Sequence, residues 1–167
     1  MKSSNTSITE EPIGVQALGG TNPPLRILVV DDDEDFRRLN AEVLIRSGYV
    51  VDAAEDGAAG WEALNANSYD LLVTDNSMPR LTGVELIKKL RTARMALPVI
   101  MATGTLPTHE FNRKPWLIPD ATLLKPFTGD ELLDTVRKVL RANDTVSEQV
   151  APPPHWQSQP SADGSWQ

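Results

Sequence analysis

The sequence predicts an α/β domain built on a five-stranded parallel sheet. Short apolar runs alternate five times with segments of helical periodicity, which is the arrangement of successive βαβ units. Charged or hydroxyl side chains follow several of these runs directly, at the edge where the carboxyl ends of parallel strands meet. The 167 residues are enough for one such domain with two terminal segments.

The first two units each pair a strand with a helix. Strand one is predicted at Leu25 to Val30, followed by a helix that ends at Gly48. This helix places four apolar residues on one face, namely Phe36, Leu39, Val43 and Leu44. Strand two is predicted at Tyr49 to Ala54. Asp56-Gly57 then predicts a turn, and Ala58 to Asn65 a helix with Trp61 and Leu64 turned inward.

The third and fifth helices are each predicted to begin with a capping box, in which Thr and Glu side chains satisfy free amides. Leu71 to Thr74 is the third strand, and Thr82-Gly83-Val84-Glu85 opens the helix after it. Ala121 to Leu124 is the fifth strand, and Thr128-Gly129-Asp130-Glu131 opens the last helix. The apolar residues expected to be buried by these helices are Val84, Ile87, Leu90, Leu132, Leu133, Val136, Val139 and Leu140.

The fourth helix is expected to be short and irregular. It follows a strand predicted at Pro98 to Ala102. Prolines at 107, 115 and 119 leave only about Thr108 to Lys114 free of a residue that removes an amide donor. One or two helical turns are therefore expected there.

The folded domain is predicted to span residues 25–142. Residues 1–24 are rich in Ser, Thr, Gly and Pro without apolar periodicity, which predicts a flexible leader. Residues 143–167 contain no Lys or Arg and include a run of three prolines at 152–154, which predicts a disordered tail.

Composition argues against several classes of protein. A formal charge of -7 disfavours general affinity for nucleic acid or anionic membranes. The chain has no cysteine, which excludes disulfides and thiolate metal sites. Neither a signal peptide nor an apolar run of membrane-spanning length is expected, so the sequence predicts a cytoplasmic protein without membrane insertion.

Acidic residues and a lysine follow three of the predicted strands. Asp31, Asp32 and Asp33 come after the first strand, Asp75 after the third and Lys125 after the fifth. Their convergence at one sheet edge predicts a combined magnesium and phosphoryl site, because Mg²⁺ prefers oxygen ligands. Asp33 is instead expected to cap the first helix.

The same pattern assigns chemistry to individual groups. Asp32, Asp75 and the backbone carbonyl of Ser77 are a sufficient set of protein ligands for Mg²⁺. Asp75 is then able to attack an activated phosphoryl group, and Lys125 to neutralise phosphoryl charge. Thr103, at the end of the fourth strand, offers a hydroxyl donor to a phosphoryl oxygen.

These motifs resemble the receiver domain of two-component response regulators over nearly all of residues 25–142. The resemblance rests on four groups of residues in the order of the family: Val29-Val30-Asp31-Asp32, Asp75 with Met78-Pro79, Thr103-Gly104, and Lys125-Pro126-Phe127. It implies a flavodoxin-like doubly wound sheet of order 2-1-3-4-5 with helices on both faces. A single-domain regulator similar to chemotaxis regulators is the expected type.

The resemblance also implies functional roles. Asp31 and Asp32 are expected as the metal pair, and Asp75 as the acceptor of a phosphoryl group from a histidine kinase or phosphotransfer protein. Thr103 is expected as the switch hydroxyl and Lys125 as the phosphate-sensing cation. A cis Lys125-Pro126 peptide bond is implied as well.

Two features depart from the family pattern. Thr122 stands three residues before the lysine, where the family usually carries an aromatic switch residue. The proline-broken fourth helix lies in a region that many receivers use for partner binding. Both departures put in question how such a domain would transmit its signal.

Three functions remain open from sequence alone. The favoured one is a stand-alone phosphoacceptor that is not an enzyme and signals through phosphorylation-dependent protein binding, without direct contact to nucleic acid. The second is a non-switching interaction module. The third is an aspartate-based phosphohydrolase of the haloacid dehalogenase type, suggested by Asp31-x-Asp33. That family expects another acidic pair after the lysine, and this chain offers only Asp130-Glu131, at the start of a predicted helix.

Overall fold

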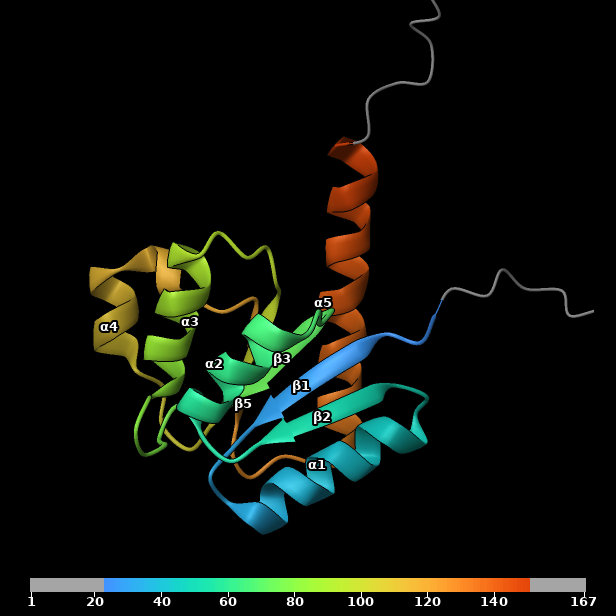
Figure 1. Cartoon of the computed structure of the whole chain (residues 1–167), viewed down its shortest axis with the longest axis horizontal. Coiled ribbons are helices and arrows are strands. Elements are labelled where there is room, and N and C mark those ends of the chain that lie inside the picture. The colour runs from blue at the N-terminus through green and yellow to red at the C-terminus, as the bar shows by residue number, and fades with distance from the viewer. Residues whose placement is uncertain (1–22, 151–167) are drawn as a thin grey trace, which may run out of the picture.

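The computed structural model describes residues 23–150, with side chains to residue 145. Five parallel strands form one sheet of order β2-β1-β3-β4-β5, which confirms the predicted order. Helices α1 and α5 cover one face, and α2, α3 and α4 cover the other (Figure 1). The predicted leader up to residue 22 and the tail from residue 151 lie outside the described residues.

The strands lie within one residue of their predicted bounds. They are β1 (Arg26–Val30), β2 (Val50–Ala54), β3 (Leu71–Thr74), β4 (Val99–Thr103) and β5 (Ala121–Leu124). The inner strands β3 and β4 are buried along their whole length, and β1 is buried beyond Arg26, because helices cover both faces of the sheet. The edge strand β5 alternates between half-buried and exposed positions.

Helices α1, α3 and α5 begin at the caps that the sequence predicts. They are α1 (Glu34–Arg46), α2 (Gly57–Ala66), α3 (Gly83–Thr92), α4 (Thr108–Arg113), the 3₁₀ helix η1 (Pro115–Leu117) and α5 (Gly129–Val150). Both capping boxes are confirmed: Thr82 and Glu85 exchange hydrogen bonds at the start of α3, and Thr128 and Glu131 do so at the start of α5. The short fourth helix is confirmed as well.

Three predictions about helices are wrong. Leu39 is 58% exposed, and the neighbouring Asn40 takes the buried position on α1 instead. Asp56-Gly57 does not form a separate turn, because Asp56 is the N-cap of α2 and Gly57 its first residue. Helix α5 continues past Ala142 to Val150, so the first part of the predicted tail is helical and stands clear of the other described elements in Figure 1.

The core consists of two apolar clusters separated by the sheet. One joins β1, β3 and β4 to α2, α3, α4 and η1, and includes Leu86, Ile87 and Leu117. The other joins the opposite sheet face to α1 and α5, and includes Leu44 and Leu132. This two-sided packing holds the carboxyl ends of the strands at one rim.

Within residues 23–150, the helices lack the combination of length and apolar character that a membrane span requires.

Candidate metal and phosphoryl site

Three aspartates meet at the carboxyl rim of the sheet. Strands β1 and β3 are neighbours with Val30 opposite Thr74, so the next residues, Asp31 and Asp75, leave the sheet side by side. Backbone hydrogen bonds hold both exits: the Asp75 amide donates to Val30, and the Asp31 amide donates to Ala54. Carboxylate oxygens of Asp31, Asp32 and Asp75 lie within 4.8 Å of one another. The structure therefore brings together the acids that the sequence singled out.

The three carboxylates differ in exposure. Asp31 is 2% exposed and Asp75 6%, whereas Asp32 faces solvent. Clustered carboxylates repel one another and favour a divalent cation, which takes oxygen ligands. The exposed Asp32 gives such an ion a route from solvent. The donor set thus fits Mg²⁺.

Asp33 lies beside the cluster but serves the helix. Its carboxylate accepts a hydrogen bond of 3.0 Å from the Phe36 amide and forms the N-cap of α1, as predicted. The Asp33 amide in turn donates to Asp31 at 2.9 Å. This role does not support the Asp31-x-Asp33 motif as the acid pair of a phosphohydrolase.

Lys125 reaches the acids from β5. Its ammonium nitrogen lies 2.6 Å from one oxygen of Asp31 and 3.5 Å from an oxygen of Asp75. The Lys125 side chain is 21% exposed, so this charge lies mostly inside the protein. The Lys125-Pro126 peptide bond is cis, as the family resemblance implied.

Burial and the lysine act in opposite directions on Asp31. Burial raises the pKa of this carboxyl, while the Lys125 ammonium and the Asp33 amide lower it, and burial prevails. The folded domain therefore disfavours the charged form of Asp31 when only the lysine balances it. A divalent cation at this point would supply the missing positive charge.

Thr103 and Ser77 are the other two residues predicted to belong to the site. The Thr103 side chain is buried at the end of β4, and its hydroxyl donates to the Thr105 carbonyl at 3.3 Å. Ser77 is exposed in the loop between β3 and α3. The roles expected for the Thr103 hydroxyl and the Ser77 carbonyl stay predictions.

The loop after Asp75 is held close to the acids. The backbone amide of Asn76 donates a hydrogen bond of 2.6 Å to an oxygen of the Asp75 carboxylate. The side-chain oxygen of Asn76 accepts a hydrogen bond from the Val84 backbone amide. A side chain at Gly83 would place its first carbon 2.2 Å from the Asp75 carbonyl oxygen, so only glycine allows this approach. These contacts tie the start of α3 to the site.

Phe36 and Arg37 contact the site, although sequence reasoning assigned them no role in it. Arg37 donates a hydrogen bond of 2.6 Å to the Asp31 carbonyl oxygen. The Lys125 ammonium lies over the Phe36 ring, 4.1 Å from its centroid. The helical pattern indicated only that Phe36 faces inward, and no local signal indicated which group it meets.

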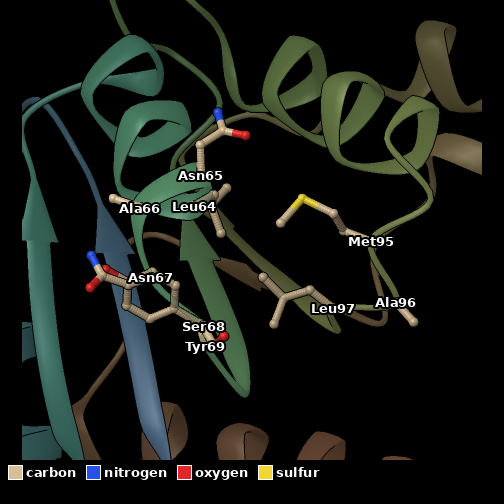
Figure 2. A pocket seen from close by; sticks show the side chains of 9 residues that line it. All are labelled: Leu64, Asn65, Ala66, Asn67, Ser68, Tyr69, Met95, Ala96 and Leu97. Carbon is tan, nitrogen blue, oxygen red and sulfur yellow. The ribbon is translucent and has the colours of Figure 1, made fainter.

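A separate hollow lies at the opposite rim of the sheet (Figure 2). Its volume is about 440 Å³, and residues 64–69 before β3 and 95–97 before β4 line it. Since these segments precede the strands, the hollow opens at their amino ends. It contains none of the acids and not Lys125.

The sequence model of the response regulator receiver domain matches residues 27–137. The chain belongs to this family. Relatives of the receiver domain include the probable transcriptional regulatory protein SilR of Salmonella typhimurium, which is 36% identical over 73% of this chain and 54% of its own length. Response regulator MprA of Mycobacterium ulcerans is 35% identical over 76% of this chain and 55% of its own length. The chain thus spans about half the length of these relatives.

Solved structures agree with the receiver fold. Chemotaxis protein CheY4 of Vibrio cholerae matches with a TM-score of 0.65 and 27% identity, over 70% of this chain and 99% of that one. Response regulator TrrA of Thermotoga maritima, solved in complex with Mg(2+)-BeF, matches with a TM-score of 0.62 and 32% identity, over 69% and 98%. The flavodoxin-like architecture expected from the sequence is therefore confirmed.

Proposed function

We propose that this receiver domain accepts a phosphoryl group on Asp75 from a histidine kinase or phosphotransfer protein. The observation that supports this assignment is the convergence of Asp31, Asp32 and Asp75 within 4.8 Å, with the Lys125 ammonium 3.5 Å from Asp75. Asp31, Asp32, Asp75 and the Ser77 carbonyl would hold Mg²⁺. The family identification and the Mg(2+)-BeF complex of TrrA support the same assignment.

The proposed transfer needs little from the protein beyond placement and charge. An Asp75 oxygen attacks phosphorus, the phosphorus–nitrogen bond of the phosphohistidine donor breaks, and the donor imidazole keeps the electron pair and takes up a proton. Asp75 becomes an acyl phosphate. Mg²⁺ held by Asp31, Asp32 and Asp75 would supply positive charge to the phosphoryl oxygens. Lys125 contributes a second positive charge from the β5 side, and Thr103 can donate its hydroxyl once it leaves the Thr105 carbonyl.

Intact mass measurement tests the proposed acceptor. The chain, incubated with Mg²⁺ and acetyl phosphate, should gain the mass of one phosphoryl group. Asp75→Asn should not gain it, whereas the control Asp35→Asn, an exposed carboxylate on α1, should. A full gain in Asp75→Asn, or no gain in the wild type, contradicts the assignment.

The output is proposed to be a change in affinity for another protein. Phosphorylation of Asp75 would alter the rim around Thr103, from which β4 leads into α4 and η1. The identity of the protein target, the stand-alone character, the cytoplasmic location and the lack of direct nucleic-acid binding stay predictions. Comparing the proteins captured by the chain with and without Mg²⁺ and beryllium fluoride tests this output.

A non-switching interaction module is the second candidate. Thr122 is exposed on β5, and α4 has only six residues before a 3₁₀ turn replaces it. Amide exchange across residues 104–122 discriminates the candidates. Protection that changes when beryllium fluoride is added supports a switch, and identical exchange supports the passive module.

A further inference from the structure

Phe36 lies against the cation of the site. It belongs to the first turn of α1, and the Lys125 ammonium stands over its ring, 4.1 Å from the centroid. The family motifs on which the assignment of the site rests do not include this residue. Its position raises the question of what the ring does for the lysine.

The contacts of the ammonium leave one side for the ring. Lys125 donates to Asp31 at 2.6 Å and lies 3.5 Å from an oxygen of Asp75. The face of an aromatic ring carries negative charge density and attracts a cation. Unlike a third carboxylate, a ring adds no formal charge to an acidic cluster. It therefore holds the ammonium without repelling a phosphoryl group.

The ring is itself held in place. Phe127 meets it edge to face, with centroids 5.2 Å apart and planes at 81°. The Phe36 amide is tied to Asp33, and the next residue, Arg37, donates to the Asp31 carbonyl. The first turn of α1 thus connects the ring to the same aspartate that the lysine contacts.

We propose that Phe36 is a positioning residue whose ring holds the Lys125 ammonium next to the Asp31 and Asp75 carboxylates, and so strengthens binding of a phosphoryl group on Asp75. This inference rests on the proposed function. It predicts that the ring matters for phosphoryl ligands and only through Lys125.

Affinity for beryllium fluoride in excess Mg²⁺, measured by calorimetry, tests the role of the ring. Phe36→Leu keeps an apolar side chain but removes the aromatic face, and should weaken binding about 5-fold to 10-fold, within the range of cation–π contacts. Phe36→Tyr keeps the face and should bind within about 2-fold of the wild type. Leu39→Ala, an exposed change on the same helix, is the matched control.

A second arm separates positioning from general stability. Affinity for Mg²⁺ alone should not fall in Phe36→Leu, because the ring holds the Lys125 ammonium, a cation that competes with Mg²⁺ for Asp31. In a Lys125→Ala background, Phe36→Leu should cause no further loss, as expected when one residue acts through another. Equal losses in both backgrounds, or Mg²⁺ affinity that falls together with beryllium fluoride affinity, overturn the proposal.

The outcomes distinguish this inference from the function on which it rests. A wild type that neither binds beryllium fluoride nor gains a phosphoryl group refutes the proposed function. A wild type that does both, with Phe36→Leu equal to it, refutes only the role of Phe36. If Phe36→Leu does not fold, Phe36→Met gives the same comparison with a more flexible apolar side chain.

Discussion

The ammonium nitrogen of Lys125 lies 2.6 Å from a carboxylate oxygen of Asp31, and 94 positions separate the two residues in the sequence. The contact crosses the carboxyl rim from β5 to β1, over the ends of β3 and β4. Asp75 lies farther from the same nitrogen, at 3.5 Å. In this state the lysine charge is therefore shared unequally, and a phosphoryl group on Asp75 has to compete with Asp31 for it.

Removing the lysine should destabilise the domain in a pH-dependent way. Lys125→Gln leaves a buried Asp31 without its cation, which should cost about 2 kcal/mol at pH 7 in the absence of Mg²⁺. The pKa of Asp31 is already raised by burial and should rise further. The folded variant then binds a proton at Asp31 more readily than the unfolded chain does. The loss of folding stability should therefore shrink as pH falls toward 3.8, the ordinary pKa of an aspartate.

Urea unfolding with a chelator at pH 4 and pH 7 measures this difference. Lys138→Gln, an exposed change on α5, is the control and should have little effect at either pH. Equal losses at both pH values for Lys125→Gln would show that the ion pair with Asp31 does not set the stability.

Magnesium should stabilise the folded chain. A ligand that binds only the folded state, present at a concentration ten times its dissociation constant, adds about 1.4 kcal/mol to the free energy of unfolding. This gain should be strongly reduced in Asp32→Asn and retained in Asp35→Asn. Thermal unfolding with and without Mg²⁺ provides the comparison, and a gain of full size in Asp32→Asn would contradict the proposed ligand set.

Asp56 should stabilise the domain through both its cap and its charge. Its carboxylate caps α2 by accepting from the Ala59 amide and pairs with Arg80. Asp56→Ala should cost about 1 kcal/mol through loss of the cap. Asp56→Asn, which keeps an acceptor oxygen, should cost less at neutral pH.

The charge of Asp56 adds a second pH dependence. Burial by itself would raise the pKa of Asp56, but the Ala59 amide and Arg80 outweigh it and lower the pKa. The contribution of the charged form is thus present above pH 3.8 and lost as pH falls below it. Urea unfolding should show Asp56→Asn converging on the wild type in acid; a constant difference between pH 7 and pH 3 speaks against the pair.

Gly83 and Gly104 should tolerate alanine very differently. At Gly83 a new methyl group would lie 2.2 Å from the Asp75 carbonyl oxygen, whereas at Gly104 nothing lies within 4 Å. Gly83→Ala should therefore destabilise the domain by about 3 kcal/mol, and Gly104→Ala should change stability by less than about 0.5 kcal/mol. Denaturant unfolding of both variants checks this, and comparable losses would contradict the close approach at Gly83.

Much of the fold could be predicted because its signals are local. A capping box needs only two residues three positions apart in one turn, so the sequence alone predicts the pairs Thr82 with Glu85 and Thr128 with Glu131. Strands buried on both faces require continuous apolar runs, which the sequence also displays. The acids and the lysine could be grouped because parallel strands end at one rim.

Other features depended on how elements pack. Leu39 and Asn40 are neighbours on α1, and apolar character predicts burial of Leu39, although Asn40 is the buried residue. Which residue is buried depends on how α1 packs against the sheet and α5, and the sequence does not contain that information. The sequence predicts the end of the folded domain at residue 142, but α5 continues to Val150. Helix propensity extends it past the last core contacts, where no apolar stripe is present.

The sequence by itself determined the alternation of strands and helices, the helix starts, and the set of charged groups at the strand ends. Only the tertiary structure decided that Lys125 pairs more closely with Asp31 than with Asp75, and that Phe36 stands under the ammonium. The reason is physical: periodicity and capping depend on residues close in sequence, whereas a contact between Lys125, which follows β5, and Phe36 on α1 depends on packing and rotamers set by the whole core.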